Sequence, residues 1–364
     1  MNIYDNRLKN VKEYLKKNNL FFLLLTPSSD LLYLTGYSKP ATDRFTALIL
    51  SENHAYFLCP ILEKNYLSEV TCEVDFVFWK DDENPFLKAF DLLGISKNSV
   101  VSVAIGAKMQ SGWLLMMMQL FPKLSWNSAD SILSFMRKIK SPEEANIIRS
   151  AQNKAERAFQ KLLNSGLEGK TEKQLSEQFI KLRFDEGFDS VGAGLIACGP
   201  NSASPHPILT DRKIRAGDTV LFDFGGTYRG YHADMSRTCA VGHVTAEFKE
   251  IYSIVLKAHL AAFDVAAPGV PCCEMDWAGR NLIENSGYGA YFTHRLGHGI
   301  GLDIHESPYA IAGNHELLAI GNVLSDEPGI YLPNRFGIRI EDLILITKEG
   351  AETLNTMSKE LLIV

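Results

Sequence analysis

The most constraining feature of the sequence is a pair of β-rich runs that flank a glycine-rich turn and carry one aspartate each. Asp223 lies in the first run and Asp234 in the second, and the glycines between them indicate a β-hairpin. If the turn lies between Tyr228 and Arg229, Asp223 faces Asp234, with Cβ atoms about 5 Å apart. Two carboxylates this close repel each other unless a cation lies between them or one is protonated. Two unrelated loop acids are the alternative for this segment taken alone.

A second hairpin near the C-terminus repeats the arrangement. Its turn is expected around residues 333–337, which brings Glu327 near Glu341. Arg339 is two residues from Glu341 and therefore shares its strand face. That face continues into leucines, so we expect the charged groups to belong to a largely buried strand. Isolated buried carboxylates are costly, whereas carboxylates that bind metal ions are not.

Histidines gather between the two hairpins. His294, His298 and His305 lie within twelve residues, among several glycines, in a chain with only nine histidines. One such histidine alone is usually structural, but three together indicate a loop where backbone and imidazoles approach a ligand. His206 is held between two prolines and is expected to be presented to a ligand rather than packed.

The four acids determine the charge of the expected site. Asp223, Asp234, Glu327 and Glu341 bring four negative charges, which two divalent cations cancel. A hydroxide bridging the cations leaves one negative charge, which Arg339 and nearby imidazoles can balance. Two metal ions about 3.5–4 Å apart activate water and hold the oxygens at the reacting centre. Manganese, cobalt, iron and zinc all fit such ligands, and the excess of carboxylates favours manganese.

Charge and composition exclude several other classes. The 364 residues include 37 Lys and Arg against 43 Asp and Glu, a net charge of −6. Nucleic acids and anionic membranes usually require a basic surface, so neither is expected as a partner. No apolar run is long enough to span a bilayer, and the six cysteines form no C-x-x-C motif, which favours a reducing cytoplasm. H-E-x-x-H, G-x-S-x-G, Walker A and dinucleotide-binding motifs are absent from the sequence.

The length and the pattern of elements predict two domains, residues 1–135 and 136–364. The first alternates short apolar runs with helical patterns, which predicts an α/β layer. A polar connector at 137–140 precedes two capping boxes, which begin at Ser141 and Thr171 and open helices to about Leu163 and Glu186. The expected strands of the first domain are 20–25, 46–50, 55–58, 74–79 and 100–104, and its expected helices are 6–17, 85–93 and 109–121. Beyond the first hairpin we expect helices over 245–266 and 272–286, then strands from 291 to 346.

The chain resembles the pita-bread metallopeptidases, which include prolidases (Xaa-Pro dipeptidases), aminopeptidases P and methionine aminopeptidases. The similar strings are Asp-Phe-Gly-Gly, Asp-Met-Ser-Arg-Thr, Gly-His-Gly-Ile-Gly, Glu-Pro-Gly-Ile-Tyr and Arg-Ile-Glu-Asp. Residues 31–37 are similar to the N-terminal domain of the creatinase, prolidase and aminopeptidase P branch, a domain that methionine aminopeptidases lack. The resemblance implies an N-terminal α/β domain of the creatinase/prolidase type. It also implies an α+β pita-bread catalytic domain, with a curved antiparallel sheet backed by helices.

The resemblance also implies a set of metal ligands. Asp223 is expected to bind one metal ion, His298 and Glu327 the other, and Asp234 and Glu341 both. Glu327 follows an aspartate where the family often has an apolar or small residue. The side chain of that aspartate, Asp326, is expected to point to the opposite face of the strand.

Catalytic roles carry over in the same way. Glu327 is expected to orient the nucleophilic water and take its proton. His206 and His305 are expected to steady the substrate carbonyl and the tetrahedral intermediate. His294 is expected to line the pocket for the proline side of the scissile bond, and Arg339 to support Glu341.

The function that the resemblance implies is metal-dependent hydrolysis of the bond before proline, in dipeptides or at the start of longer peptides, by a cytoplasmic homodimer. The substrate is thus a proline-containing di- or oligopeptide. The alternative is a metal-free, creatinase-like hydrolase or a binding protein of the same fold. In such relatives metal ligands are replaced, whereas this chain retains all five.

Overall fold

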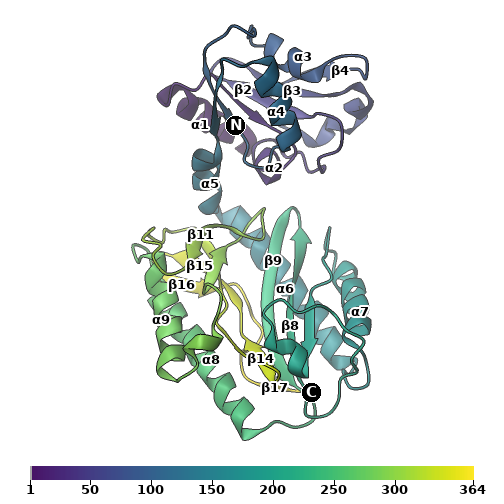
Figure 1. The fold of residues 1–364 in the computed structure, drawn as a ribbon, viewed down its shortest axis with the longest axis vertical. Coiled ribbons are helices and arrows are strands. Elements are labelled where there is room, and N and C mark those ends of the chain that lie inside the picture. Colours follow the sequence, from purple (N-terminus) through teal and green to yellow (C-terminus); the bar gives the residue numbers. More distant parts are fainter. Residues whose placement is uncertain (1) are drawn as a thin grey trace. The chain divides into compact units, whose positions relative to one another are not determined.

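The first compact unit of the chain is built on one mixed sheet. The computed structural model describes residues 2–364, and contacts divide them into a unit ending at Arg137 and a unit from Lys138 to Val364 (Figure 1). The sheet of the first unit has the strand order β4-β3-β2-β1-β5-β6. β3–β4, β1–β5 and β5–β6 are parallel, and β1–β2 and β2–β3 are antiparallel. Helices alternate with these strands, so the predicted α/β layer is confirmed.

The elements of this unit lie close to the predicted ranges. The strands are β1 (Phe22–Leu25), β2 (Ala47–Ser51), β3 (Ala55–Pro60), β4 (Asp75–Trp79), β5 (Ser102–Ile105) and β6 (Ser125–Ser128). The helices are α1 (Ile3–Lys17), α2 (Ser29–Thr35), a 3₁₀ segment η1 (Ile61–Glu69), α3 (Pro85–Asp91), α4 (Ser111–Leu120) and α5 (Asp130–Lys138).

Four elements were not expected: α2, the 3₁₀ segment η1, β6 and α5. The residues of β6 are largely exposed, so no apolar alternation marks it. α5 extends through Lys138, where a polar connector was predicted. Its Leu133 and Arg137 are both buried, and Arg137 donates a hydrogen bond to Asp30 over 2.7 Å. A buried ion pair thus takes the place of an apolar contact on this helix.

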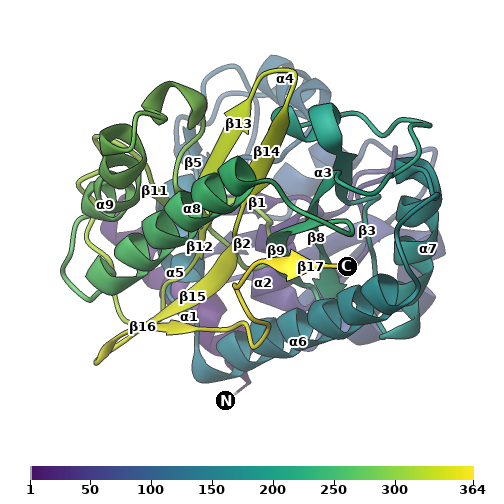
Figure 2. The ribbon, with the colours of Figure 1, turned by 90° about the horizontal axis from the view of Figure 1, so that it is seen from below.

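The second unit consists of two halves, each with a helix pair against a sheet. In the first half α6 and α7 pack on the strands of the order β17-β9-β8-β7. In the second half α8 and α9 pack on the antiparallel sheet β11-β10-β12-β15-β16 and on the hairpin β13–β14. Figure 2 draws β9 and β15 between the long helices α6 and α8. Both predicted capping boxes are confirmed, at Ser141 before α6 and at Thr171 before α7.

The elements of the second unit have the following bounds. The helices are α6 (Pro142–Asn164), α7 (Glu172–Asp185), α8 (Ala246–Val265) and α9 (Cys272–Asn285), with 3₁₀ segments η2 (Gly199–Ala203) and η3 (Gly289–Tyr291). The strands of the first half are β7 (Leu195–Cys198), β8 (Thr219–Tyr228), β9 (Tyr231–Ala240) and β17 (Leu362–Ile363). Those of the second half are β10 (Gly297–Gly299), β11 (Glu306–Ala310), β12 (Val323–Asp326), β13 (Gly329–Leu332), β14 (Phe336–Arg339), β15 (Asp342–Thr347) and β16 (Gly350–Thr353).

The register of the first hairpin differs from the expected one. Tyr228 pairs with Tyr231, so the loop contains only Arg229 and Gly230, and both have positive φ (52° and 82°). Positive φ at both loop residues is typical of the type I′ turn that suits a two-residue hairpin. Asp234 therefore pairs with Gly225, and the expectation that it lies directly opposite Asp223 is wrong.

Candidate metal centre

A cavity of about 350 Å³ in the second unit is lined by every residue that the sequence singled out as functional. Three further residues, Pro205, Arg295 and Ile311, complete its lining. The predicted residues that line it are His206, Asp223, Asp234, His294, His298, His305, Glu327, Arg339 and Glu341.

The five expected metal ligands come from both halves of the unit. Asp223 lies in β8 and Asp234 in β9, whereas His298 lies in β10. Glu327 follows β12 directly, and Glu341 precedes β15 directly. Because side chains alternate along a strand, the two-residue offset of the first hairpin keeps its two aspartates on one face.

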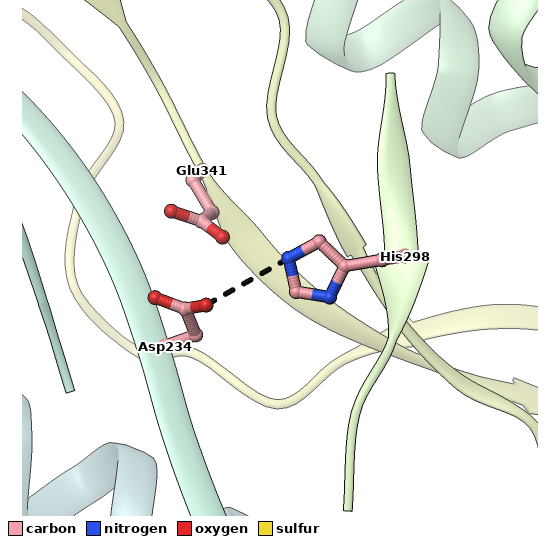
Figure 3. Close-up of side chains that lie close together, drawn as sticks. All are labelled: Asp234, His298 and Glu341. Carbon is pink, nitrogen blue, oxygen red and sulfur yellow. Dashed lines mark ion pairs between the residues drawn. The ribbon is translucent and has the colours of Figure 1, made fainter. Parts of the chain in front are cut away.

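The ligand atoms of three of these side chains form one compact group. The ligand atoms of Asp234, His298 and Glu341 all lie within 4.8 Å of one another, and Figure 3 shows the three side chains pointing toward one common space. His298 Nε2 is 3.8 Å from Asp234 Oδ2 and 3.3 Å from Glu327 Oε1. This group offers carboxylate oxygens and an imidazole nitrogen, the donors that divalent transition metals bind.

The carboxylates carry opposed pKa shifts. Burial, reinforced by the neighbouring carboxylates, raises the pKa of Asp234 and of Glu341 well above their ordinary values. Burial also acts to raise the pKa of Glu327, but its hydrogen bond with His298 and nearby positive charges lower that pKa to about 2. The ionised forms of these crowded, buried carboxylates repel one another, and bound cations would stabilise them.

The tautomer of His298 also fits a metal ligand. Its Nδ1 lies 3.1 Å from the carbonyl oxygen of Gly299. A carbonyl oxygen can only accept, so Nδ1 donates this bond. Nε2 is the ring atom that faces the carboxylates, and a bound metal ion would replace the proton with which it contacts Glu327. A backbone acceptor behind the ring fixes metal-binding histidines in this way. The residues present therefore fit a divalent metal site in donor type, charge and orientation.

Arg339 connects the metal-site acids to the histidines. Its guanidinium donates to Asp223 Oδ2 over 2.6 Å and to the Tyr331 hydroxyl over 2.7 Å. The ring of His294 donates from Nδ1 to the carbonyl oxygen of Arg295, so its Nε2 accepts the hydroxyl proton of Tyr331 over 2.9 Å. Burial lowers the pKa of His294, which keeps it neutral.

The two remaining histidines are exposed residues that line the cavity. The His206 side chain is exposed, as expected for its loop. The His305 ring packs edge-on against His298, with centroids 4.3 Å apart. Burial, together with His298 and Arg295, lowers the pKa of His305 to about 4.

Asp326 points away from the cavity that Glu327 lines. It is completely buried, and its Oδ2 lies 3.3 Å from Nδ1 of His259 in α8. Asp342, paired with Asp326 across β12 and β15, binds Arg237 over 2.6 Å on this same side. The sheet thus has a second, separate ionic cluster behind the strands that bear the glutamates.

Four supporting residues were not predicted. Ser236 donates to Glu341 Oε2 over 2.6 Å, and Ser325 donates to Glu327 Oε1 over 3.1 Å. Gln152 of α6 binds both backbone groups of Asp234, the N–H over 2.9 Å and the carbonyl oxygen over 2.7 Å. The fourth residue is Tyr331, described above. Strand alternation from Asp234 and Glu327 could have identified Ser236 and Tyr331, whereas nothing local points to Gln152.

Comparisons with known proteins agree with this arrangement. Residues 146–348 match metallopeptidase family M24, and residues 7–139 match the creatinase/prolidase N-terminal domain. The chain is 34% identical over 367 residues to Xaa-Pro dipeptidase of Pyrococcus horikoshii, over the full length of both. The structure matches recombinant prolidase from Thermococcus sibiricus with a TM-score of 0.94 and 33% identity, covering both chains completely. It matches X-Pro aminopeptidase from Thermotoga maritima with a TM-score of 0.87 and 29% identity, over 98% of this chain and 99% of that one.

The two domain matches define the class as a peptidase with a creatinase/prolidase N-terminal domain and a pita-bread catalytic domain, so the predicted fold is confirmed. The chain belongs to metallopeptidase family M24. None of the helices within residues 2–364 is long and apolar enough to cross a membrane.

Proposed function

We propose that this chain hydrolyses the peptide bond preceding proline, as a Xaa-Pro dipeptidase or a Xaa-Pro aminopeptidase. The observation that carries the proposal is the convergence of four carboxylates and four imidazoles in one cavity. The names of its relatives, Xaa-Pro dipeptidase, prolidase and X-Pro aminopeptidase, support the preference for proline. The peptide nitrogen of an X–Pro bond carries no hydrogen, and the proline ring fixes φ. Peptidases that bind the substrate through this N–H therefore do not accept it.

The proposed cofactor is a pair of divalent metal ions, with manganese favoured over cobalt, zinc or iron by the excess of carboxylates. Asp223 would hold one ion, His298 and Glu327 the other, and Asp234 and Glu341 both. Such a pair of ions lowers the pKa of a water molecule held between them and polarises the substrate carbonyl.

The chain's own side chains would perform the remaining tasks. Glu327, whose lowered pKa keeps it ionised at neutral pH, is the proposed general base for the attacking water. His305 stays neutral because of its lowered pKa, and with His206 it would donate hydrogen bonds to the substrate carbonyl and the tetrahedral intermediate. His294, fixed through Tyr331, would line the proline pocket. Arg339 would hold the site's acids in place through Ser236 and Asp223.

We also propose an N-terminal domain of residues 1–135 and a catalytic domain of residues 136–364, working as a cytoplasmic homodimer. The division of contacts after Arg137 supports this boundary. The six cysteines, none of which forms a disulfide, are consistent with a reducing compartment.

The proposal is tested by metal analysis combined with peptide hydrolysis. Purified protein, stripped of metal and then given Mn²⁺, is assayed on Ala-Pro, Ala-Pro-Ala and Ala-Ala. We expect two metal ions per chain and Mn²⁺-dependent release of alanine from Ala-Pro or Ala-Pro-Ala, but not from Ala-Ala. A protein that binds no divalent metal and cleaves neither proline-containing peptide would contradict the proposal.

A further inference from the structure

A buried ion pair in the second unit includes the residue next to His305. Lys140 Nζ donates to Glu306 Oε1 over 2.6 Å, and the two side chains are only 1% and 9% exposed. Glu306 begins β11 and directly follows His305, which lines the cavity. The ion pair itself lies outside that lining, so the proposed chemistry does not use it.

The carboxylate of Glu306 also binds the loop between β10 and β11. Its Oε2 accepts the backbone N–H of Asp303 over 3.3 Å, so both carboxylate oxygens are engaged. The N–H of Gly301 donates to the carbonyl oxygen of Asp303 over 3.0 Å, and the carbonyl oxygen of Gly301 accepts from His232 N–H over 2.8 Å. The loop of residues 300–305 is thus bound to β9 near its start and to Glu306 near its end.

The backbone of this loop packs closely against the ion pair. A Cβ atom on Gly301 would lie 2.6 Å from Glu306 Oε1 and 3.1 Å from Lys140 Cε. Only a residue without Cβ allows the backbone to approach the two charged groups this closely. A shift of the Glu306 carboxylate would therefore shift the loop as well.

Strand pairing alone does not determine where His305 lies. β10 pairs with β11, but the register shifts between His298 and Gly299, and Gly299 lies opposite Glu306. The His305 ring nevertheless packs edge-on against the His298 ring, with centroids 4.3 Å apart. A side chain that stabilises a transition state must be held to within about 0.5 Å. The contacts of Glu306 supply the restraint that the irregular pairing lacks.

Stability alone does not explain a buried ion pair at this position. Removing two charges from water is costly, and a well-packed apolar pair is often equally stable. An ion pair of fixed length and direction, in contrast, specifies one geometry. We propose that Lys140 and Glu306 are positioning residues, which hold the 300–305 loop so that His305 donates to the tetrahedral intermediate. This inference rests on the proposed function, from which it takes the role of His305.

The kinetic test is a double-mutant cycle with Mn²⁺, on the better substrate of Ala-Pro and Ala-Pro-Ala. Lys140→Met alone would leave the Glu306 carboxylate buried without its cation, so the paired variant combines Lys140→Met with Glu306→Leu. We expect His305→Ala to lower kcat at least about a hundredfold, the loss typical of a transition-state donor. The paired variant should lower kcat about ten- to hundredfold, the effect of a misplaced catalytic group.

The combination of the paired variant with His305→Ala distinguishes positioning from a general structural role. If Lys140 and Glu306 act through His305, the triple change lowers kcat no further than His305→Ala alone. Glu306→Gln, which keeps the size of the side chain and an acceptor for the Asp303 N–H, should show a smaller loss that also disappears in the His305→Ala background. Losses that multiply, or wild-type kcat in either the paired variant or His305→Ala, overturn the inference.

A neighbouring ion pair provides the matched control. Lys138, two residues before Lys140, binds Glu316. Lys138→Met combined with Glu316→Leu should leave kcat within about twofold of the wild type. The paired variant itself should bind Mn²⁺ with wild-type affinity, because none of the proposed metal ligands is changed. A loss of Mn²⁺ affinity that accounts for the lower kcat overturns the inference.

Hydrogen exchange separates failure of this inference from failure of the proposed function. The exchange of the amides of residues 300–306 is followed by mass spectrometry on the metal-loaded chain. We expect these amides to exchange at least about tenfold faster in the paired variant, with unchanged exchange in β8. Unchanged exchange of the loop overturns the inference even if X-Pro bonds are cleaved. Cleavage of neither peptide contradicts the proposed function, and the exchange rates still decide whether the ion pair holds the loop.

Discussion

Replacing Gly225 by alanine is expected to abolish tight metal binding through a backbone collision. Gly225 pairs with Asp234 across β8 and β9, and a Cβ atom on Gly225 would lie 1.8 Å from the carbonyl oxygen of Ala233. A Cβ atom essentially never lies within 3.0 Å of another heavy atom. The two strands must therefore separate by roughly 1.2 Å. A backbone oxygen cannot turn aside as a flexible side chain can.

The size of this displacement sets the expected effect. Metal–ligand distances tolerate deviations of about 0.2 Å, several times less than the required separation of the strands. Asp234, proposed to contact both ions, lies on the strand that must move. We expect Mn²⁺ affinity to fall at least about a hundredfold, or about 2.7 kcal/mol. The free energy of unfolding of the metal-free protein should fall by about 1–3 kcal/mol, as at other overpacked sites.

The assay is calorimetric titration of metal-free protein with Mn²⁺, combined with urea unfolding followed by circular dichroism. Gly192→Ala is the matched control, because a Cβ there meets nothing nearer than the Gly194 nitrogen at 4.0 Å. We expect the control to bind Mn²⁺ like the wild type. Wild-type Mn²⁺ affinity in Gly225→Ala would refute the reasoning, since the strands could then accept the Cβ without moving Asp234.

Three further outcomes follow from the same site. Asp234→Asn should abolish Mn²⁺-dependent turnover in the peptide assay; retained activity would mean that Asp234 is not a ligand to both ions. Gln152→Leu leaves the buried N–H and carbonyl oxygen of Asp234 without partners and should lower the free energy of unfolding by about 2–4 kcal/mol, whereas a change below about 0.5 kcal/mol in urea denaturation would rule this out. In metal-free protein the raised pKa values of Asp234 and Glu341, above their ordinary 3.8 and 4.5, mean that folding takes up protons. Its unfolding temperature should therefore fall as the pH rises above these ordinary values, and Mn²⁺ should suppress this trend; a rise with pH contradicts it.

The error in the predicted register of the first hairpin does not move its two aspartates to different strand faces, for a physical reason. Asp234 pairs with Gly225 and not with Asp223, which is a shift of two residues along β8. Because the shift is even, Asp223 and Asp234 remain on the same face of the hairpin. Only an odd shift would have sent one of them to the opposite face. Arg229 was not expected in a loop position with positive φ, because residues other than glycine, asparagine and aspartate seldom adopt it.

The second hairpin was predicted in the correct register. Leu332 pairs with Phe336 in β13–β14, and Asp326 pairs with Asp342 in β12–β15, so the same alignment runs through Glu327 and Glu341. The turn is shorter than the expected residues 333–337, because Phe336 and Gly337 already belong to β14, but the expected approach of Glu327 to Glu341 agrees with this pairing.

What the sequence could not supply is contact between distant elements. Gln152 lies 82 positions before Asp234, and only the packing of α6 on β9 brings them together. The ionic cluster of His259 and Asp326 likewise depends on how α8 covers β12. Polar elements such as β6 also escaped prediction, because apolar periodicity carries no information about a strand whose side chains face solvent.

The distribution of the metal ligands over both halves of the catalytic unit has a consequence for the lifetime of the protein. Asp223 and Asp234 belong to the first half, and His298, Glu327 and Glu341 to the second, so in the proposed holoenzyme the ions act as a removable crosslink between two packed layers. The strength of that crosslink depends on the free metal concentration, because ligand binding stabilises the folded state by mass action. Metal depletion would then make the chain more susceptible to proteolysis and would also remove its activity. The supply of metal would thus determine the lifetime of the enzyme as well as its turnover rate.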